Sequence, residues 1–152
     1  MNNFHVAQVN VALAKDNMES EVMKGFVSRL DEINALADRA EGFVWRLKDD
    51  GGSATAIRVF DDPLLLVNMT VWQSLEALRQ YVYKSLHVEL IRDRDRWFNK
   101  MHELHQALWW VSAGHIPSVQ EAKQKLEHIR EHGPSQDAFT FSKPHPAPSH
   151  GG

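Results

Sequence analysis

Two histidines near the middle of the sequence are the first residues whose types and spacing could do chemistry. His102 and His105 enclose a glutamate in the stretch MHELHQALWWV (Met101 to Val111), which looks like a zinc-protease motif. That motif needs its histidines four residues apart, so that both imidazoles reach one metal ion with the glutamate beside them as base. Here the spacing is three, and no third ligand follows at a recognisable offset. We interpret the pair as exposed histidines before a buried strand and expect no metal site, with a shared zinc ion as the alternative.

His87 and Arg94 are a second pair that could act together. With Ile91 and Phe98 they follow the spacing i, i+4, i+7 and i+11, which places all four on one half-apolar helical stripe. A polar pair on such a stripe can face a cavity, where His87 would accept a proton and Arg94 would bind a ligand oxygen. The alternative is structural, with His87 bonded to a buried backbone group and Arg94 in an internal ion pair.

The composition limits the classes of function. The chain has 152 residues, 43% hydrophobic and 24% charged, as in one globular domain. A net charge of -3 provides no basic field for nucleic acid or an anionic membrane, and neither is expected as a partner. Without cysteines there are no disulfides and no thiolate chemistry, which suits a reducing cytosol. No apolar run approaches the roughly 20 residues that span a bilayer, so we expect a soluble cytoplasmic protein.

Hydrophobic periodicity predicts the elements that must position these side chains. Residues 4–11 are rich in valine and short enough for a strand, which places Phe4, Val6, Gln8 and Asn10 on one face. Capping patterns at Asp16, Ser74 and Ser118 indicate three helix starts. We expect strands over residues 4–11, 43–47, 64–72 and 107–111 and a short strand or arm over 54–60. We expect helices over 16–39 and from 118 to 133, and a helix from 74 followed by a second helix or a bent continuation to about 105.

The order strand, helix, strand, strand, helix, strand is that of a ferredoxin-like α+β domain, with helices on one face of an antiparallel sheet. Both faces of the predicted strands are apolar, so we expect a partner to cover the second face. Two sheets packed face to face would give a dimeric α+β barrel, hence a homodimer. One domain would occupy residues 1–141, followed by a proline-rich, disordered tail over residues 142–152.

Several motifs carry a family resemblance. The stretch TVWQSLEALRQYVYKSLH (Thr70 to His87) resembles the Trp-x-Ser, Glu-Ala, Ser-x-His signature of the dimeric α+β barrel superfamily, which includes the antibiotic-biosynthesis monooxygenases. The blocks RDRWF (Arg94 to Phe98), LWWVSAGHIP (Leu108 to Pro117) and HGPSQDAFTF (His132 to Phe141) resemble one bacterial domain-of-unknown-function family within it. The resemblance covers the chain to about Phe141 and implies the same fold and the same dimer.

The resemblance also implies site residues. Asn10 and Trp72 fall where the monooxygenase relatives carry a first-strand asparagine and a pocket tryptophan; core packing is the alternative for both. The candidate catalytic residues are His87, Trp72 and Asn10, and the candidate ligand-binding residues are Arg94, Trp45 and Trp97.

We therefore expect a small-molecule-binding protein, with activity like that of a cofactor-independent monooxygenase on a flat aromatic or polyketide-like compound. The alternatives are a non-catalytic dimeric binding or structural protein, or a haem-binding protein. Where haem-degrading relatives place their histidine, this chain offers Ile91 or Arg92, with His87 one turn earlier. Because that histidine is missing, we favour a protein without haem and expect no cofactor. The superfamily covers too many chemistries to decide whether this chain is an enzyme.

Overall fold

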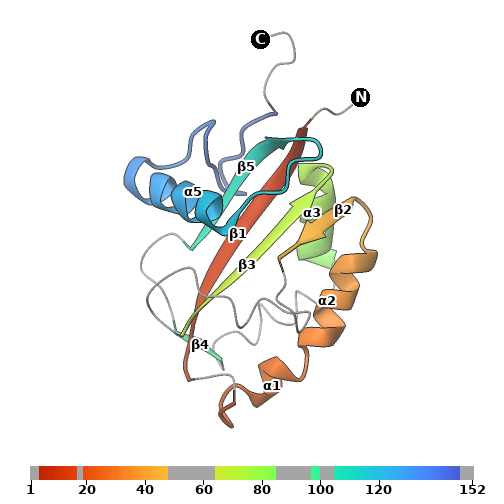
Figure 1. Ribbon diagram of the computed structural model, residues 1–152, viewed down its shortest axis with the longest axis vertical. Coiled ribbons are helices and arrows are strands. Elements are labelled where there is room, and N and C mark those ends of the chain that lie inside the picture. Colours follow the sequence, from red (N-terminus) through yellow and green to blue (C-terminus); the bar gives the residue numbers. More distant parts are fainter. Residues whose placement is uncertain (1–3, 17–18, 48–63, 85–96, 100–104, 148–152) are drawn as a thin grey trace.

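An antiparallel sheet forms the centre of the computed structural model, which describes residues 4–16, 19–47, 64–84, 97–99 and 105–147 (Figure 1). Its strands are β1 (Phe4–Ala14), β2 (Phe43–Arg46), β3 (Leu65–Trp72), β4 (Phe98–Asn99) and β5 (Gln106–Ser112). The order runs β2-β3-β1, and both β5 and the short β4 pair with β1. This is the ferredoxin-like strand order. The predicted α+β class is therefore confirmed.

β1 is the central strand, and its valine-rich sequence suits that place because β-branched side chains pack well on a pleated surface. Asn10 lies opposite Asn68 of β3 and opposite Gln106 of β5. Val6 and Ala7 belong to different hydrophobic clusters, as the alternation predicts. The sheet therefore has two distinct faces, which we name after the helices that cover them.

The α3 face carries Val6, Gln8 and Asn10. It is covered by α1 (Lys24–Val27), α2 (Leu30–Arg39) and α3 (Leu75–Lys84), and Figure 1 shows α2 and α3 together on one side of the sheet. At one end of this face Val6 packs with Trp72 and with Leu78 of α3. At the other end Ala14 packs with Met23 and Trp97. Two apolar clusters thus occupy the two ends of the face.

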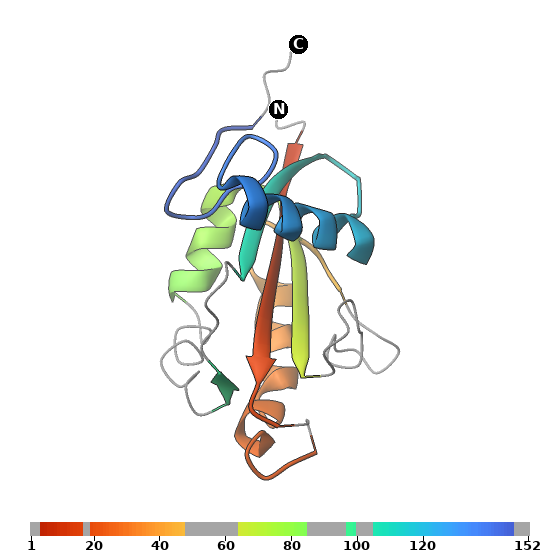
Figure 2. The same cartoon turned by 90° about the vertical axis from the view of Figure 1, so that its left-hand side faces the viewer.

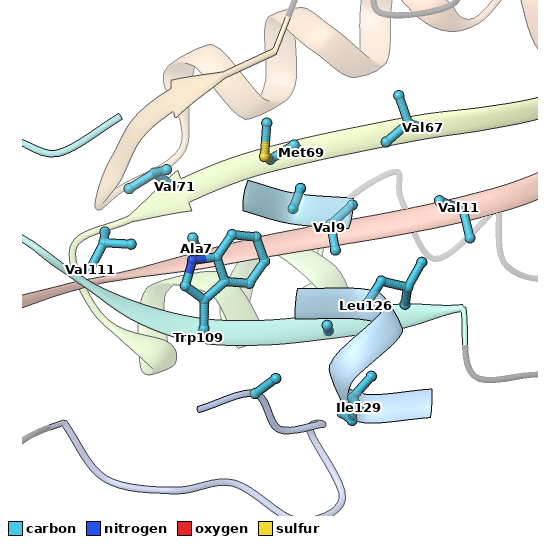
Figure 3. Packing of buried hydrophobic residues seen from close by; sticks show 13 residues of the cluster. Ala7, Val9, Val11, Val67, Met69, Val71, Trp109, Val111, Leu126 and Ile129 are labelled. Atoms are coloured by element: carbon cyan, nitrogen blue, oxygen red, sulfur yellow. The ribbon is translucent and has the colours of Figure 1, made fainter. Parts of the chain in front are cut away.

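The α5 face is the opposite one, and α5 (Val119–His132) lies across it (Figure 2). Ala122, Leu126 and Ile129 of α5 are fully buried against strand residues that include Ala7, Val9 and Trp109 (Figure 3). The side chain of Ser118 accepts a hydrogen bond from the Glu121 backbone N–H at 3.0 Å, so the predicted helix start is confirmed.

Coverage of the α5 face bears on the expected dimer. We expected a second subunit to bury this face, whereas its residues Val9, Val11 and Met69 are already buried within one chain, partly by α5. Among the described residues, the large hydrophobic side chains that remain exposed are scattered; they are Val22, Val27 and Ile116. The homodimer therefore stays a prediction without the support of a bare apolar face.

Two predicted helix boundaries are wrong. The first helix does not start at Asp16, because residues 19–23 form turns and α1 begins at Lys24. The second helix or bent continuation predicted to reach about His105 does not include Trp97, which lies in a turn immediately before β4. That prediction was based only on the spacing of apolar residues, which does not reveal the short strand β4. The predicted arm over 54–60 lies outside the described residues.

The segment after α5 returns to the sheet. Phe139 exchanges two backbone hydrogen bonds of 2.8 Å with Leu108 of β5, which covers the outer edge of that strand. Beyond it, the carbonyl oxygen of His145 accepts a hydrogen bond from the Trp110 indole at 2.9 Å. The described part of the proline-rich tail, to residue 147, thus has packing contacts that its composition did not predict.

Candidate functional site

Three amide side chains form a row across the middle of the α3 face. Asn68, Asn10 and Gln106 are direct neighbours on β3, β1 and β5, so their side chains share one face. We call these three residues the amide row. No hydrogen bond joins their side chains to one another or to any other described residue. The Asn10 Oδ1 atom is buried without a partner, whereas Asn68 is exposed.

The next position along this face of the strands is polar as well, but its side chains are hydrogen-bonded. Thr70 of β3 lies opposite Gln8 of β1, and its Oγ1 atom accepts a hydrogen bond of 2.8 Å from Gln8 Nε2. The same oxygen accepts a second bond of 2.8 Å from Trp72 Nε1. Gln8 and Thr70 are both 6% exposed. These hydrogen bonds hold the side chains of Gln8, Thr70 and Trp72 in place beside the amide row.

Aromatic rings flank the row on both sides, towards the two ends of the strands. The Trp72 ring meets Phe43 edge to face at 5.4 Å and lies against Tyr81 at 5.0 Å. At the far end, Phe26 of α1 packs on Trp97 with a centroid distance of 5.8 Å. Such pairs hold rings in fixed orientations. The amides therefore lie between two rigid apolar walls.

Tyr81 is the one described group whose pKa is clearly displaced. The pKa of its phenol is raised from 10.0 to about 12, mainly by burial and then by the Asp38 carboxylate, while the Arg46 guanidinium opposes the shift. Arg46 Nε donates to Asp38 Oδ1 at 2.8 Å and joins β2 to α2. Tyr81 is therefore neutral in any physiological solution and cannot serve there as a phenolate base.

The structure brings together only some of the predicted site residues. Asn10, Trp72 and Trp97 share the α3 face. Trp72 is fully buried and its indole N–H is bonded to Thr70, so it walls the site and does not offer a hydrogen bond to a ligand. Trp45 packs with the cluster on the α5 face, so it does not share a site with Asn10. His87 and Arg94 lie outside the described residues.

Sequence reasoning missed several residues of this region. Thr70, Tyr81 and Arg46 were not singled out, although Thr70 is alternate with Trp72 on β3 and therefore had to share its face. Gln106 was missed because its neighbour Asn10 belongs to a strand almost a hundred residues earlier. Only the register between β1 and β5 reveals that pair.

A separate groove of about 660 Å³ lies between α2 and α3. Leu36, Ala40 and Ala77 give it an apolar floor, while Arg39 and Glu76 stand among its polar lining. Gly42 lets the turn after α2 approach α3, since a Cβ there would come within 2.5 Å of the Ala77 Cβ. Tyr81 lines this groove and also contacts Trp72, so the groove adjoins the aromatic wall of the candidate site.

Within the described ranges, no group of three or more histidine, aspartate or glutamate side chains could hold a metal ion. His105 is exposed immediately before β5, as we expected of that histidine, and His102 lies outside those ranges. No described helix is long and apolar enough to cross a membrane.

The fold and the partly covered polar row define a ferredoxin-like α+β protein with a candidate small-molecule site on one sheet face. The chain belongs to the family described as "Domain of unknown function (DUF3291)", whose model matches residues 5–151. The predicted membership of a domain-of-unknown-function family is thereby confirmed. No curated protein matches the sequence.

Solved structures with a similar fold come from several bacteria. A protein of unknown function from Nitrosomonas europaea is 12% identical, with a TM-score of 0.48, covering 78% of this chain and 99% of its own. SnoaB, a cofactor-independent oxygenase from Streptomyces nogalater, is 17% identical, with a TM-score of 0.47 and coverages of 75% and 98%. A dabb family protein with a ferredoxin-like fold from Mesorhizobium loti is 14% identical, with a TM-score of 0.44 and coverages of 76% and 98%.

Proposed function

We propose that the protein binds a neutral, flat organic molecule against the amide row. Asn10 carries the proposal, because its amide oxygen is buried and has no hydrogen-bond partner among the described residues. An unpaired buried polar atom costs about 1–3 kcal/mol, so one that persists calls for an explanation. A ligand hydroxyl or N–H placed over the row would donate to this oxygen and remove the cost.

The size and chemistry of the row support this class of ligand. Neighbouring strands lie about 4.8 Å apart, so three amides across three strands offer donors and acceptors over roughly 10 Å. That span matches a molecule of two or three fused rings. The amides carry no charge, and the aromatic clusters on either side of the row provide apolar walls. Mostly apolar walls with a few convergent polar groups are typical of ligand sites.

Isothermal titration calorimetry with a dihydroxynaphthalene and its dimethyl ether tests the proposal. The two probes share a ring system, but only the first can donate a hydrogen bond. Asn10→Ala should weaken binding of the dihydroxy compound about tenfold, the effect of about 1.4 kcal/mol, and leave the ether unchanged. Asn34→Ala on α2 is the matched control. If wild type and Asn10→Ala bind the dihydroxy compound equally well, Asn10 does not accept a hydrogen bond from the ligand and the proposal is wrong.

Oxygenation of the bound molecule is a separate proposal, supported by the sequence resemblance alone. In it, His87 takes a proton from a substrate CH₂ group, the carbanion bonds to O₂, and the protonated peroxide loses water to leave a carbonyl. The substrate itself supplies the electrons, so no cofactor is needed, and the enzyme would be a cytoplasmic homodimer. An oxygen electrode measures the reaction directly. We expect wild type to consume oxygen in the presence of the bound compound and His87→Ala to consume none. If the compound binds and wild type consumes no oxygen, the non-catalytic alternative is favoured.

A further inference from the structure

Gln8 carries another amide on the α3 face, and only half of this amide is hydrogen-bonded. The side chain is 6% exposed, and its Nε2 atom donates to Thr70 Oγ1 at 2.8 Å. Its Oε1 atom accepts no hydrogen bond from any residue that the structure describes. An amide oxygen can accept two such bonds, and polar side chains that are almost fully buried normally use their acceptors. Gln8 therefore offers an unused acceptor beside the amide row.

Thr70 holds the Gln8 amide in its orientation. The Thr70 Oγ1 atom accepts a bond of 2.8 Å from Gln8 Nε2 and another of 2.8 Å from Trp72 Nε1. An indole nitrogen can only donate, and a hydroxyl oxygen has two acceptor positions, so both positions of Thr70 are occupied. Because the amide nitrogen of Gln8 points towards Thr70, the oxygen on the other side of the same carbon is directed away from it. This orientation keeps Gln8 Oε1 available to a ligand.

Asn10 places a second acceptor two residues further along β1. Gln8 and Asn10 lie opposite Thr70 and Asn68 of β3, and they share one face because side chains alternate along a strand. The Asn10 Oδ1 atom is buried without a partner. Two residues of a strand span about 7 Å, so the two amides offer their oxygens at roughly that separation. Both amides are neutral, so they suit the hydroxyl groups of an uncharged molecule.

We propose that the site selects flat aromatic diols, in which one hydroxyl group donates to Asn10 Oδ1 and the other to Gln8 Oε1. The inference rests on the proposed function and adds to it a requirement for two donors about 7 Å apart. A phenol with a single hydroxyl group pairs only one of the two oxygens and leaves the other without a bond. Thr70 is then a positioning residue, since it acts on the ligand only by holding the Gln8 amide.

Calorimetric titration of the full chain with naphthalene-2,7-diol, whose hydroxyl groups are about 7 Å apart, and with the naphthol that lacks one of them tests the selection. We expect wild type to bind the diol about tenfold more tightly than the naphthol, because the diol pairs one more buried acceptor. In Gln8→Met, which has no amide, the advantage of the diol should fall below about threefold. Gln124→Met, at an exposed position of α5, is the matched control and should keep the wild-type advantage.

Variants of Thr70 separate positioning from a purely structural role. Thr70→Val keeps the shape of the side chain and removes the hydroxyl group, so the Gln8 amide is free to rotate and the advantage of the diol should be lost. Thr70→Ser returns the hydroxyl group and should return the advantage. Circular dichroism of the two variants shows whether the fold is retained. This pair also tests the inference if Gln8→Met does not fold.

Failure of this inference and failure of the proposed function give different results. If wild type binds both compounds and Asn10→Ala weakens both, but the diol has an advantage below about threefold, the selection of diols is wrong and the proposed function stands. The selection is equally wrong if the diol keeps its full advantage in Gln8→Met or in Thr70→Val. If wild type binds neither compound, the proposed function and this inference are both wrong.

Discussion

Replacing Asn10 by leucine should raise the stability of the protein and at the same time lower its affinity for the ligand. The Asn10 amide oxygen is buried without a partner, whereas apolar clusters flank it along the same face. Leucine removes the unpaired polar atom and adds apolar area to a partly buried position. A residue kept for the fold alone would not show opposite effects on stability and binding.

The size of the effect follows from the unpaired atom. Leaving a buried acceptor without a hydrogen bond costs about 1–3 kcal/mol, and leucine recovers that cost apart from any strain from its larger volume. We therefore expect the free energy of unfolding to rise by about 1–2 kcal/mol. For a chain of this size each kcal/mol corresponds to about 2–4 °C in melting temperature. Urea unfolding followed by circular dichroism measures the first quantity, and a thermal melt the second.

Gln8→Leu is the matched control, because Gln8 is on the same strand face two residues earlier. Its amide does have a partner, the Thr70 hydroxyl oxygen at 2.8 Å. Leucine there breaks a buried hydrogen bond and should lower stability by about 0.5–1.5 kcal/mol. The reasoning is refuted if Asn10→Leu also lowers stability, since the Asn10 amide would then be making a stabilising bond in the folded protein.

Further predictions test other parts of the structure. Absorbance titration of the two tyrosines should show one phenol ionising only near pH 12, and Tyr81→Phe should remove that step. Because the folded pKa of Tyr81 is the raised one, its contribution to stability should be complete below pH 10 and lost as the pH rises towards 12. Leu126→Ala should cost about 2–5 kcal/mol in urea unfolding, since the Leu126 side chain of α5 is fully buried against the sheet; a loss below about 1 kcal/mol would mean that α5 packs loosely. Removal of residues 142–152 takes away the acceptor of the Trp110 indole and should shift tryptophan emission; an unchanged spectrum would contradict that contact. Light scattering should give about twice the 17.4 kDa chain mass if the predicted homodimer forms, and the chain mass itself if it does not.

Local patterns predicted the strands and the last helix well, because each depends on neighbouring residues. Alternation in β1 gave both of its faces, and the Ser118 and Glu121 pair together with Gly133 gave both ends of α5. The side of the sheet that α5 would cover could not be read in this way. An amphipathic helix shows only that it has an apolar stripe, and the strand face that meets the stripe depends on the path of the chain.

The candidate site was predictable to the same extent. Resemblance supplied Asn10 and Trp72, and strand alternation placed Gln8 beside Asn10. The Asn10 oxygen is unpaired and the Gln8 amide is bonded because different residues lie opposite them on β3. Asn10 lies opposite Asn68, and Gln8 lies opposite Thr70. Likewise, only the three-dimensional packing shows that the Trp72 N–H is already bonded.

The position of α5 also determines how the fold responds to dilution. A face buried by a second subunit loses its cover as the protein concentration falls, so the melting temperature of such an assembly depends on concentration. Here α5 itself buries the face, and the six residues 113–118 join it to β5. Glu121 holds α5 in place, because its carboxylate accepts a hydrogen bond from the Trp109 indole at 2.9 Å and pairs with His115 at 2.8 Å. A tethered segment acts at a fixed, high effective concentration. The α5 face should therefore stay buried at concentrations where two free chains would separate.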